Sequence, residues 1–253
     1  AVVCAGAGDN AAAAVGTNTV EQGGCNISLG TSGTVFIPTD KYVKTSNPAL
    51  HSFCHATGKW HLMGCILTAA SANKWLTEDV MRSDYDDSDI AAEKPSACSK
   101  NLFFLPYLSG ERCPHNDARA KGAFIGLTHE TSRADLRRAV YEGVAFALKD
   151  CLELCPMTFS SATACGGGAK SKVWLDIIAS VLDLPISAIG SEGPALGGAI
   201  LAAECAGIDI PVRIEPERTA VPDPELSEYY RSKYKKYTQL YPLLKDFFAD
   251  ELT

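Results

Sequence analysis

The stretch Ala-Gly-Ala-Gly-Asp-Asn-Ala-Ala-Ala-Ala-Val-Gly, residues 5–16, decides between two kinds of nucleotide-binding fold. An apolar run over residues 1–5 predicts a strand before it, and its alanines predict a helix over residues 11–15. This order satisfies the G-x-G-x-x-A pattern of a dinucleotide-binding fold. Asp9 argues against that fold, because its carboxylate would lie beside the pyrophosphate. Moreover, no acidic residue ends a second strand about 20 residues later, where a ribose partner is expected.

Two further glycine-rich turns occur in the chain. Gly30-Thr31-Ser32-Gly33 separates two β-like runs, residues 25–29 and 34–37, and predicts a hairpin. Gly166-Gly167-Gly168-Ala169-Lys170-Ser171 follows a predicted strand over residues 162–165. The glycine that G-x-x-x-x-G-K-[ST] requires before its lysine is missing there, so the turn is not a P-loop.

The three turns are more informative together than apart. A carboxylate at a helix N-terminus stays ionised and can accept a proton from a hydroxyl that attacks phosphorus. Amides of a hairpin turn can line a phosphate, and glycines allow a flat ring or a ribose to approach closely. Taken singly, each turn has a structural explanation: a helix cap, a plain hairpin or a helix entry. Their co-occurrence favours phosphoryl transfer from a nucleotide.

The remaining pattern alternates strands and helices without an internal repeat, which predicts one α/β domain. Ser132 and Asp135 form a capping-box pattern at the start of one helix. Pro194 opens another helix, which ends before Gly207. Helices are predicted over residues 68–81, 136–152, 172–183, 194–206 and 225–248, an extended segment over 103–106 and a polar loop over 109–121.

Two charged segments are interpreted as solvent-exposed. The acidic, serine-rich stretch over residues 83–99 is typical of a variable surface region. The basic cluster over residues 231–236 is interrupted by tyrosine and predicts a solvated helix face.

Composition excludes several classes of protein. A net charge of −7 argues against bulk nucleic-acid binding and against an acidic membrane surface, and no apolar run approaches the ~18 residues of a membrane span. The ten cysteines contain no C-x-x-C pair, so we expect free thiols in a reducing cytoplasm and neither disulfides nor a metal site. The N-terminus has no signal-peptide pattern. It lacks an initiator Met and opens directly on a strand-like apolar run, so we expect a piece of a longer protein.

Several motifs resemble those of the FGGY carbohydrate kinases. The first two turns carry the general resemblance, over residues 5–16 and 28–35. A xylulokinase-like subgroup is indicated by His-Ser-Phe-Cys-His-Ala (51–56), Trp-His-Leu-Met (60–63), Phe-Leu-Pro-Tyr-Leu-Ser-Gly-Glu-Arg-Cys-Pro-His-Asn (104–116), Lys-Gly-Ala-Phe-Ile-Gly-Leu-Thr-His (121–129) and Gly-Gly-Gly-Ala-Lys-Ser-Lys-Val-Trp (166–174).

The resemblance implies a ribonuclease-H-like domain of the actin, hexokinase and Hsp70 type. It further implies that residues 1–253 are the C-terminal, ATP-binding half of a two-domain sugar kinase whose N-terminal half lies outside this chain. That absent half would carry the aspartate associated with Mg²⁺ and most sugar contacts. The chain alone is then expected to be inactive and prone to association. A homodimer is one expected form of assembly.

The roles that the resemblance implies can be assigned position by position. Asp9 would be the catalytic base and Asn10 a contact to a sugar hydroxyl. The ATP contacts would be Gly30, Thr31 and Ser32 in the hairpin turn and Gly166, Gly167, Gly168 and Ser171 in the third turn. The expected reaction is phosphorylation of D-xylulose by MgATP. Kinases of ribulose, gluconate or glycerol, and a non-catalytic nucleotide-binding subunit, are the alternatives.

Overall fold

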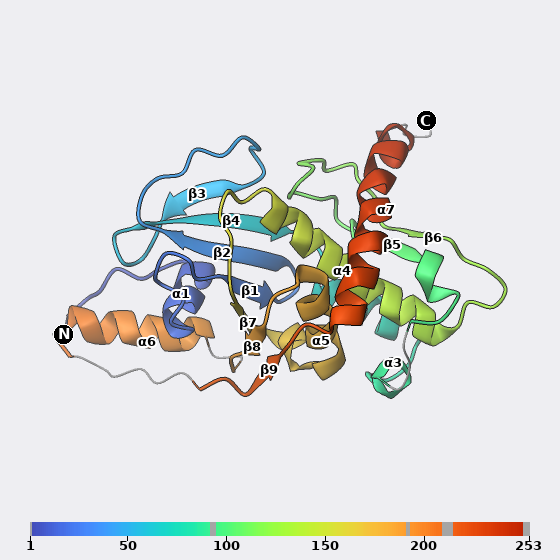
Figure 1. Ribbon diagram of the computed structural model, residues 1–253. Helices are drawn as coiled ribbons and strands as arrows, with labels where there is room; N and C mark the ends of the chain where they lie inside the picture. The colour runs from blue at the N-terminus through green and yellow to red at the C-terminus, as the bar shows by residue number, and fades with distance from the viewer. Residues whose placement is uncertain (1, 92–94, 191–192, 209–214, 250–253) are drawn as a thin grey trace.

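A seven-stranded mixed sheet organises the chain (Figure 1). The computed structural model describes residues 2–91, 95–190, 193–208 and 215–249. The strand order is β3-β4-β2-β1-β7-β8-β9, in which β1–β7 and β7–β8 are parallel and the other pairs are antiparallel. The strands are β1 (Asn26–Leu29), β2 (Gly33–Thr39), β3 (His51–Cys54), β4 (Trp60–Ile66), β7 (Ala162–Cys165), β8 (Ile186–Ala188) and β9 (Arg218–Ala220). An antiparallel meander continued by parallel crossovers is the ribonuclease-H-like arrangement, so the predicted α/β class is confirmed.

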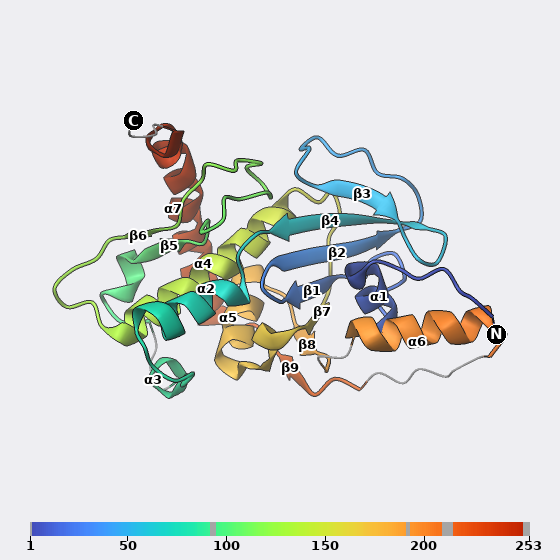
Figure 2. The same cartoon turned by 180° about the vertical axis from the view of Figure 1, so that it is seen from behind.

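Helices cover both faces of this sheet (Figures 1 and 2). On one face lie α1 (Asp9–Gly16) and α6 (Gly193–Cys205). On the other face lie α4 (Arg133–Glu153) and α5 (Lys172–Leu182), with α7 (Pro224–Ala249) packed outside them. The smaller elements are α2 (Ala70–Lys74), the π-helical turn η1 (Trp75–Val80), α3 (Ser88–Ala91), the 3₁₀ turns η2 (Ser99–Asn101) and η3 (Gly167–Lys170), and the paired strands β5 (Phe103–Leu105) and β6 (Ala123–Ile125). The helices and the hairpin expected from the sequence are therefore present.

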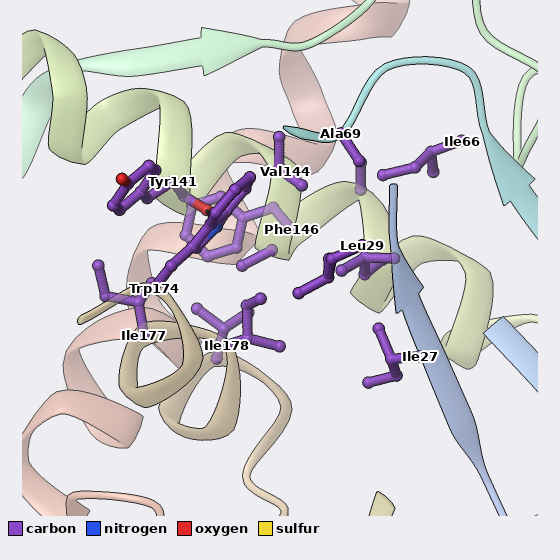
Figure 3. Close-up of a cluster of buried hydrophobic side chains, with 14 of the residues drawn as sticks. Ile27, Leu29, Ile66, Ala69, Tyr141, Val144, Phe146, Trp174, Ile177 and Ile178 are labelled. Carbon is purple, nitrogen blue, oxygen red and sulfur yellow. Dashed lines mark hydrogen bonds between the residues drawn. The ribbon is translucent and has the colours of Figure 1, made fainter. Parts of the chain in front are cut away.

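The two faces of the sheet differ in chemistry, because successive side chains of a strand point to opposite faces. Ile27 and Leu29 of β1 point toward α4 and α5, where they join a fully buried apolar core with Trp174 (Figure 3). The opposite face is polar under α1: Asn26 donates to Thr163 at 2.8 Å, and further hydroxyl contacts link Thr17 and Thr19 to the same pair. These hydrogen bonds hold the C-terminal end of α1 against the sheet.

The first strand predicted from the sequence is not formed. Val2 and Val3 are 69% and 92% exposed, and residues 2–8 have no strand pairing; Ala1 lies outside the described residues. The next strand along the chain, β1, is not available to it, since both sides of β1 are paired with β2 and β7. Asp9 consequently begins a helix after an irregular segment, with Gly8 at the N-cap position.

Helix α4 confirms one prediction and corrects another. Its first turn contains the predicted capping box between Ser132 and Asp135. Further along, the buried Glu142 forms an ion pair with Lys233 of α7, with 2.5 Å between Oε2 and Nζ. Lys233 belongs to the basic cluster that was expected to be solvated, and that expectation is wrong at this residue. Its ammonium also donates to the Ser99 carbonyl, so its charge is compensated inside the protein.

Helices α1 and α6 approach so closely that glycine is required at their contact. A Cβ added to Gly197 would lie 1.8 Å from the carbonyl oxygen of Ala12, and one added to Gly16 would lie 1.9 Å from that of Gly193. These contacts are to backbone atoms, which cannot rotate away. The position of α1, and with it Asp9, therefore depends on the glycines of α6.

This contact generates a stability prediction. Gly197→Ala should lower the free energy of unfolding by about 2–3 kcal/mol, because one helix must shift to admit the methyl group. The neighbouring Gly198 has nothing within 4 Å of an added Cβ. Gly198→Ala should therefore be neutral or stabilise by up to ~1 kcal/mol through helix propensity. Chemical denaturation of both variants checks this, and equal effects would disprove the close-contact explanation.

Candidate functional site

The N-terminus of α1 carries the carboxylate and the amide that the sequence singled out. Asp9 is exposed, and its Oδ1 accepts hydrogen bonds from the Asn10 backbone N–H at 2.8 Å and from Asn10 Nδ2 at 3.3 Å. Asn10 Oδ1 in turn accepts from Thr34 Oγ1 at 2.9 Å. Thr34 follows the hairpin turn directly, so this bond joins the first turn to the second. In the described part of the chain, Asp9 Oδ2 accepts from no protein donor and is open to a reactant.

The hairpin turn between β1 and β2 is oriented by its carbonyl groups. The oxygens of Gly30 and Thr31 accept from the amides of Ala70 and Ala69, both at 2.9 Å, and Ser71 Oγ donates to the Thr31 oxygen at 2.7 Å. The start of α2 thus binds the carbonyl side of the turn. Among the described residues, the amides of Thr31 and Ser32 have no acceptor and are free for an anion.

The third turn is held against the second by Gly166. This residue has φ +92°, and an added Cβ would lie 2.8 Å from the Leu29 carbonyl oxygen and 3.2 Å from the Gly30 amide nitrogen. A side chain is excluded there both by the backbone conformation and by space. Gly167 is different: it is exposed, and nothing lies within 4 Å of an added Cβ.

A cavity of about 610 Å³ opens beside these two turns. Thr31 and Ser71 line it on one side, and Gly167 and Gly168 on another. The remaining lining residues are Ala70, Asn73, Lys74, Tyr85, Asp87, Tyr141, Lys170, Ser171 and Trp174. Its size is typical of a site for a small molecule or cofactor.

One wall of the cavity is a hydrogen-bonded cluster of Tyr141, Asp87 and Ser171. The Tyr141 hydroxyl donates to Asp87 Oδ1 at 2.7 Å, and Ser171 Oγ donates to Asp87 Oδ2 at 2.6 Å. Burial, together with this bond, raises the pKa of Tyr141 well above its usual range, so the hydroxyl remains a donor. The ring of Tyr141 stacks on that of Trp174 with 4.5 Å between centroids, which fixes its position. Ser171 also accepts from the Trp174 amide and so caps α5.

The structure thus brings the predicted residues together around residues 29–34. Asp9 and Asn10 connect through Thr34, and Gly166 contacts Leu29. Sequence reasoning missed Asp87, which lies in the acidic stretch that was interpreted as a variable surface region. The only signal at hand was negative charge, which indicates a solvated segment as readily as a wall of a site.

Metal ligands are not grouped in the described residues: no three His, Cys, Asp or Glu side chains are placed to hold one ion. All ten cysteines are free thiols. Among the helices that the structure describes, none has the length and apolar character needed to span a membrane.

Comparison with known proteins gives this geometry its context. Residues 25–205 match the C-terminal domain of the FGGY family of carbohydrate kinases. The chain belongs to the FGGY family. The xylulose kinase of Escherichia coli (strain K12) is 38% identical over 253 residues, which cover 96% of this chain and 52% of that protein. The chain therefore spans about half the length of the relatives it matches.

Solved structures of a xylulose kinase and a gluconate kinase share the fold. A xylulose kinase from Brucella ovis superposes with a TM-score of 0.84 at 40% identity, covering 95% of this chain and 52% of that one. A gluconate kinase from Lactobacillus acidophilus superposes with a TM-score of 0.82 at 24% identity, covering 92% and 50%, which shows the fold alone. The predicted family and its C-terminal domain are confirmed.

The two adjacent glycines of the third turn generate a paired prediction. Gly166→Ala should lower the free energy of unfolding by about 1–3 kcal/mol, because alanine is strained at this φ and meets the Leu29 carbonyl. Gly167→Val should leave stability nearly unchanged but weaken ADP binding by about tenfold, because its methyl groups enter the cavity. Thermal unfolding and calorimetric titration with ADP separate the two effects. Loss of stability in Gly167→Val would contradict the open space at that position.

Proposed function

We propose that this chain is the ATP-binding half of a two-domain kinase that phosphorylates a pentulose, D-xylulose in the first instance. The observation that carries the proposal is the convergence of three turns on residues 29–34, which groups an exposed carboxylate, free amides and a cavity. The similarity to xylulose kinases supports the choice of sugar. We extend the domain to residues 1–253, because α1 and α7 pack onto the region that matches the family.

Asp9 would act as the general base. The sugar hydroxyl attacks the γ-phosphorus, its oxygen forms the new P–O bond, and the bond from phosphorus to the β,γ-bridging oxygen breaks, so ADP leaves with that electron pair. The hydroxyl proton passes to Asp9. With Oδ1 bound by Asn10, the proton would pass to Oδ2. Asn10 is proposed to contact a second sugar hydroxyl through Nδ2, since its Oδ1 is bound by Thr34.

The two glycine turns would divide the nucleotide between them. The free amides of Thr31 and Ser32 suit the phosphates, in the manner of other backbone anion sites. Gly167, Gly168 and Ser171 line the cavity where the nucleoside would lie, and Gly166 holds their turn in place. ATP would bring Mg²⁺ as its counter-ion, and the resemblance to the FGGY kinases assigns the aspartate associated with that ion to the other half.

The identity of the sugar is the part of the proposal for which there are specific alternatives. A gluconate kinase shares this fold, so ribulose, gluconate and glycerol are alternative acceptors that the fold alone does not separate. A non-catalytic nucleotide-binding subunit is less well supported, because it would not need an exposed carboxylate at the N-terminus of α1. The N-terminal half would come from the same chain or from a separate one. A homodimer is one possible assembly of the complete enzyme. The free thiols are consistent with a reducing cytoplasm.

Replacing the base should reduce turnover without unfolding the protein. In the complete enzyme, Asp9→Asn should lower kcat by ~10²–10⁴, because general-base catalysis is lost. The amide oxygen of the substituted side chain can still accept from the next backbone N–H, so the melting temperature should stay within ~2 °C. Asp246→Asn is the matched control, because this exposed carboxylate lies in the last turn of α7 (Pro224–Ala249). An Asp9→Asn enzyme within tenfold of the wild-type kcat would remove Asp9 from this role.

This chain by itself should show no kinase activity. Asp9 would face bulk water, which screens its charge, and only one side of the phosphate site would be present. Release of ADP that depends on both ATP and xylulose, measured for the purified chain and for the chain mixed with its N-terminal half, checks this. Turnover of the chain alone at ~1–100 s⁻¹, the usual range of kinases, would contradict the proposed division of labour.

A further inference from the structure

Arginine side chains of α4 hold the segment of residues 83–91 through hydrogen bonds to its backbone carbonyls. The Arg137 guanidinium donates to the carbonyls of Asp84 and Asp86, and Arg138 donates to the carbonyl of Ile90 at 2.9 Å. Both arginines are buried. A segment that was expected to be a variable surface region is thus held at a fixed position against the cavity.

These hydrogen bonds from α4 place one carboxylate of the segment in the wall of the cavity. Asp87 lines the cavity, whereas its neighbours Asp84 and Asp86 are exposed outside it. Each oxygen of Asp87 accepts one hydrogen bond, from Tyr141 and from Ser171. A carboxylate has about four lone-pair sites, so two acceptor sites remain for a ligand. Because the carboxylate is held on two sides, its ordering is complete before a ligand arrives.

Charge determines which end of a nucleotide can face Asp87. A triphosphate next to this carboxylate would be repelled, whereas the free amides of Thr31 and Ser32 attract it. Thr31 and Asp87 line the same cavity, together with Lys74 and Lys170. The uncharged nucleoside is the part of the nucleotide that can face the Asp87 carboxylate without this repulsion.

We propose that Asp87 is a specificity residue for the nucleotide, whose carboxylate accepts a hydrogen bond from a donor of the nucleoside. This inference rests on the proposed function. The donor is the exocyclic amine of adenine or a hydroxyl of the ribose, since these are the N–H and O–H groups that face outward from adenosine. With the amine as donor, the residue also discriminates against guanine, which presents a carbonyl oxygen at the corresponding position and would be repelled.

The test is calorimetric titration of the complete enzyme with ADP, GDP, 2′-deoxy-ADP and 3′-deoxy-ADP. Asp87→Asn should weaken ADP binding by at least about tenfold, as expected for a lost hydrogen bond to a charged acceptor. If the amine is the donor, GDP binding should change less than threefold or become tighter. If a ribose hydroxyl is the donor, the effect of the substitution should disappear with one of the two deoxy nucleotides.

Asp84→Asn is the matched control, because it removes the same charge from the same segment outside the cavity. It should leave all four affinities within twofold. An equal loss for all four nucleotides in Asp87→Asn, or the same small effect as in Asp84→Asn, would overturn the assignment of Asp87 while leaving the proposed function intact. Absence of ADP binding to the wild-type enzyme would overturn both.

Discussion

The site depends on one close backbone contact, between Gly166 and the end of β1. Residues 29 and 30 lie so near Gly166 that a Cβ there would overlap the Leu29 carbonyl, and the backbone adopts φ +92° to make the approach. Because β1 and β7 are parallel neighbours, the turns that follow them leave the sheet at the same edge. The contact converts two separate turns into one surface with free amides on one side and the cavity on the other.

The third component, Asp9, is placed by a different set of forces. The face of the sheet beneath α1 is polar, and hydrogen bonds among Thr17, Thr19, Asn26 and Thr163 hold the end of that helix. On its side away from the sheet, α1 packs against α6 through close backbone contacts at Gly16 and Gly197. The apolar core between β1, α4 and α5 supports the opposite side of the sheet (Figure 3). Asp9 is thus exposed for chemistry although its helix is firmly held.

Much of this arrangement could be predicted from the sequence, because its parts are local. The glycine turns, the helix after Asp9 and the capping box at Ser132 depend on residues close in the chain. The features that the sequence did not predict depend on contacts between residues far apart in the chain. The apolar run over residues 1–5 does not reach β1, whose two sides are paired with β2 and β7. Lys233 is buried because Glu142 lies opposite, and Asp87 lines the cavity because two arginines of α4 hold its segment. No periodicity or composition carries such pairings.

Hydrogen–deuterium exchange of the complete enzyme, with and without ADP, measures the central claim that one nucleotide occupies both turns. The account predicts that ADP slows exchange in peptides containing Thr31–Ser32 and in peptides containing Gly167–Ser171 together, with equal dependence on ADP concentration. Slowed exchange confined to residues 5–16, with both turns unchanged, would instead favour a nucleotide on the N-terminus of α1, as in a dinucleotide-binding fold. That result would contradict the account.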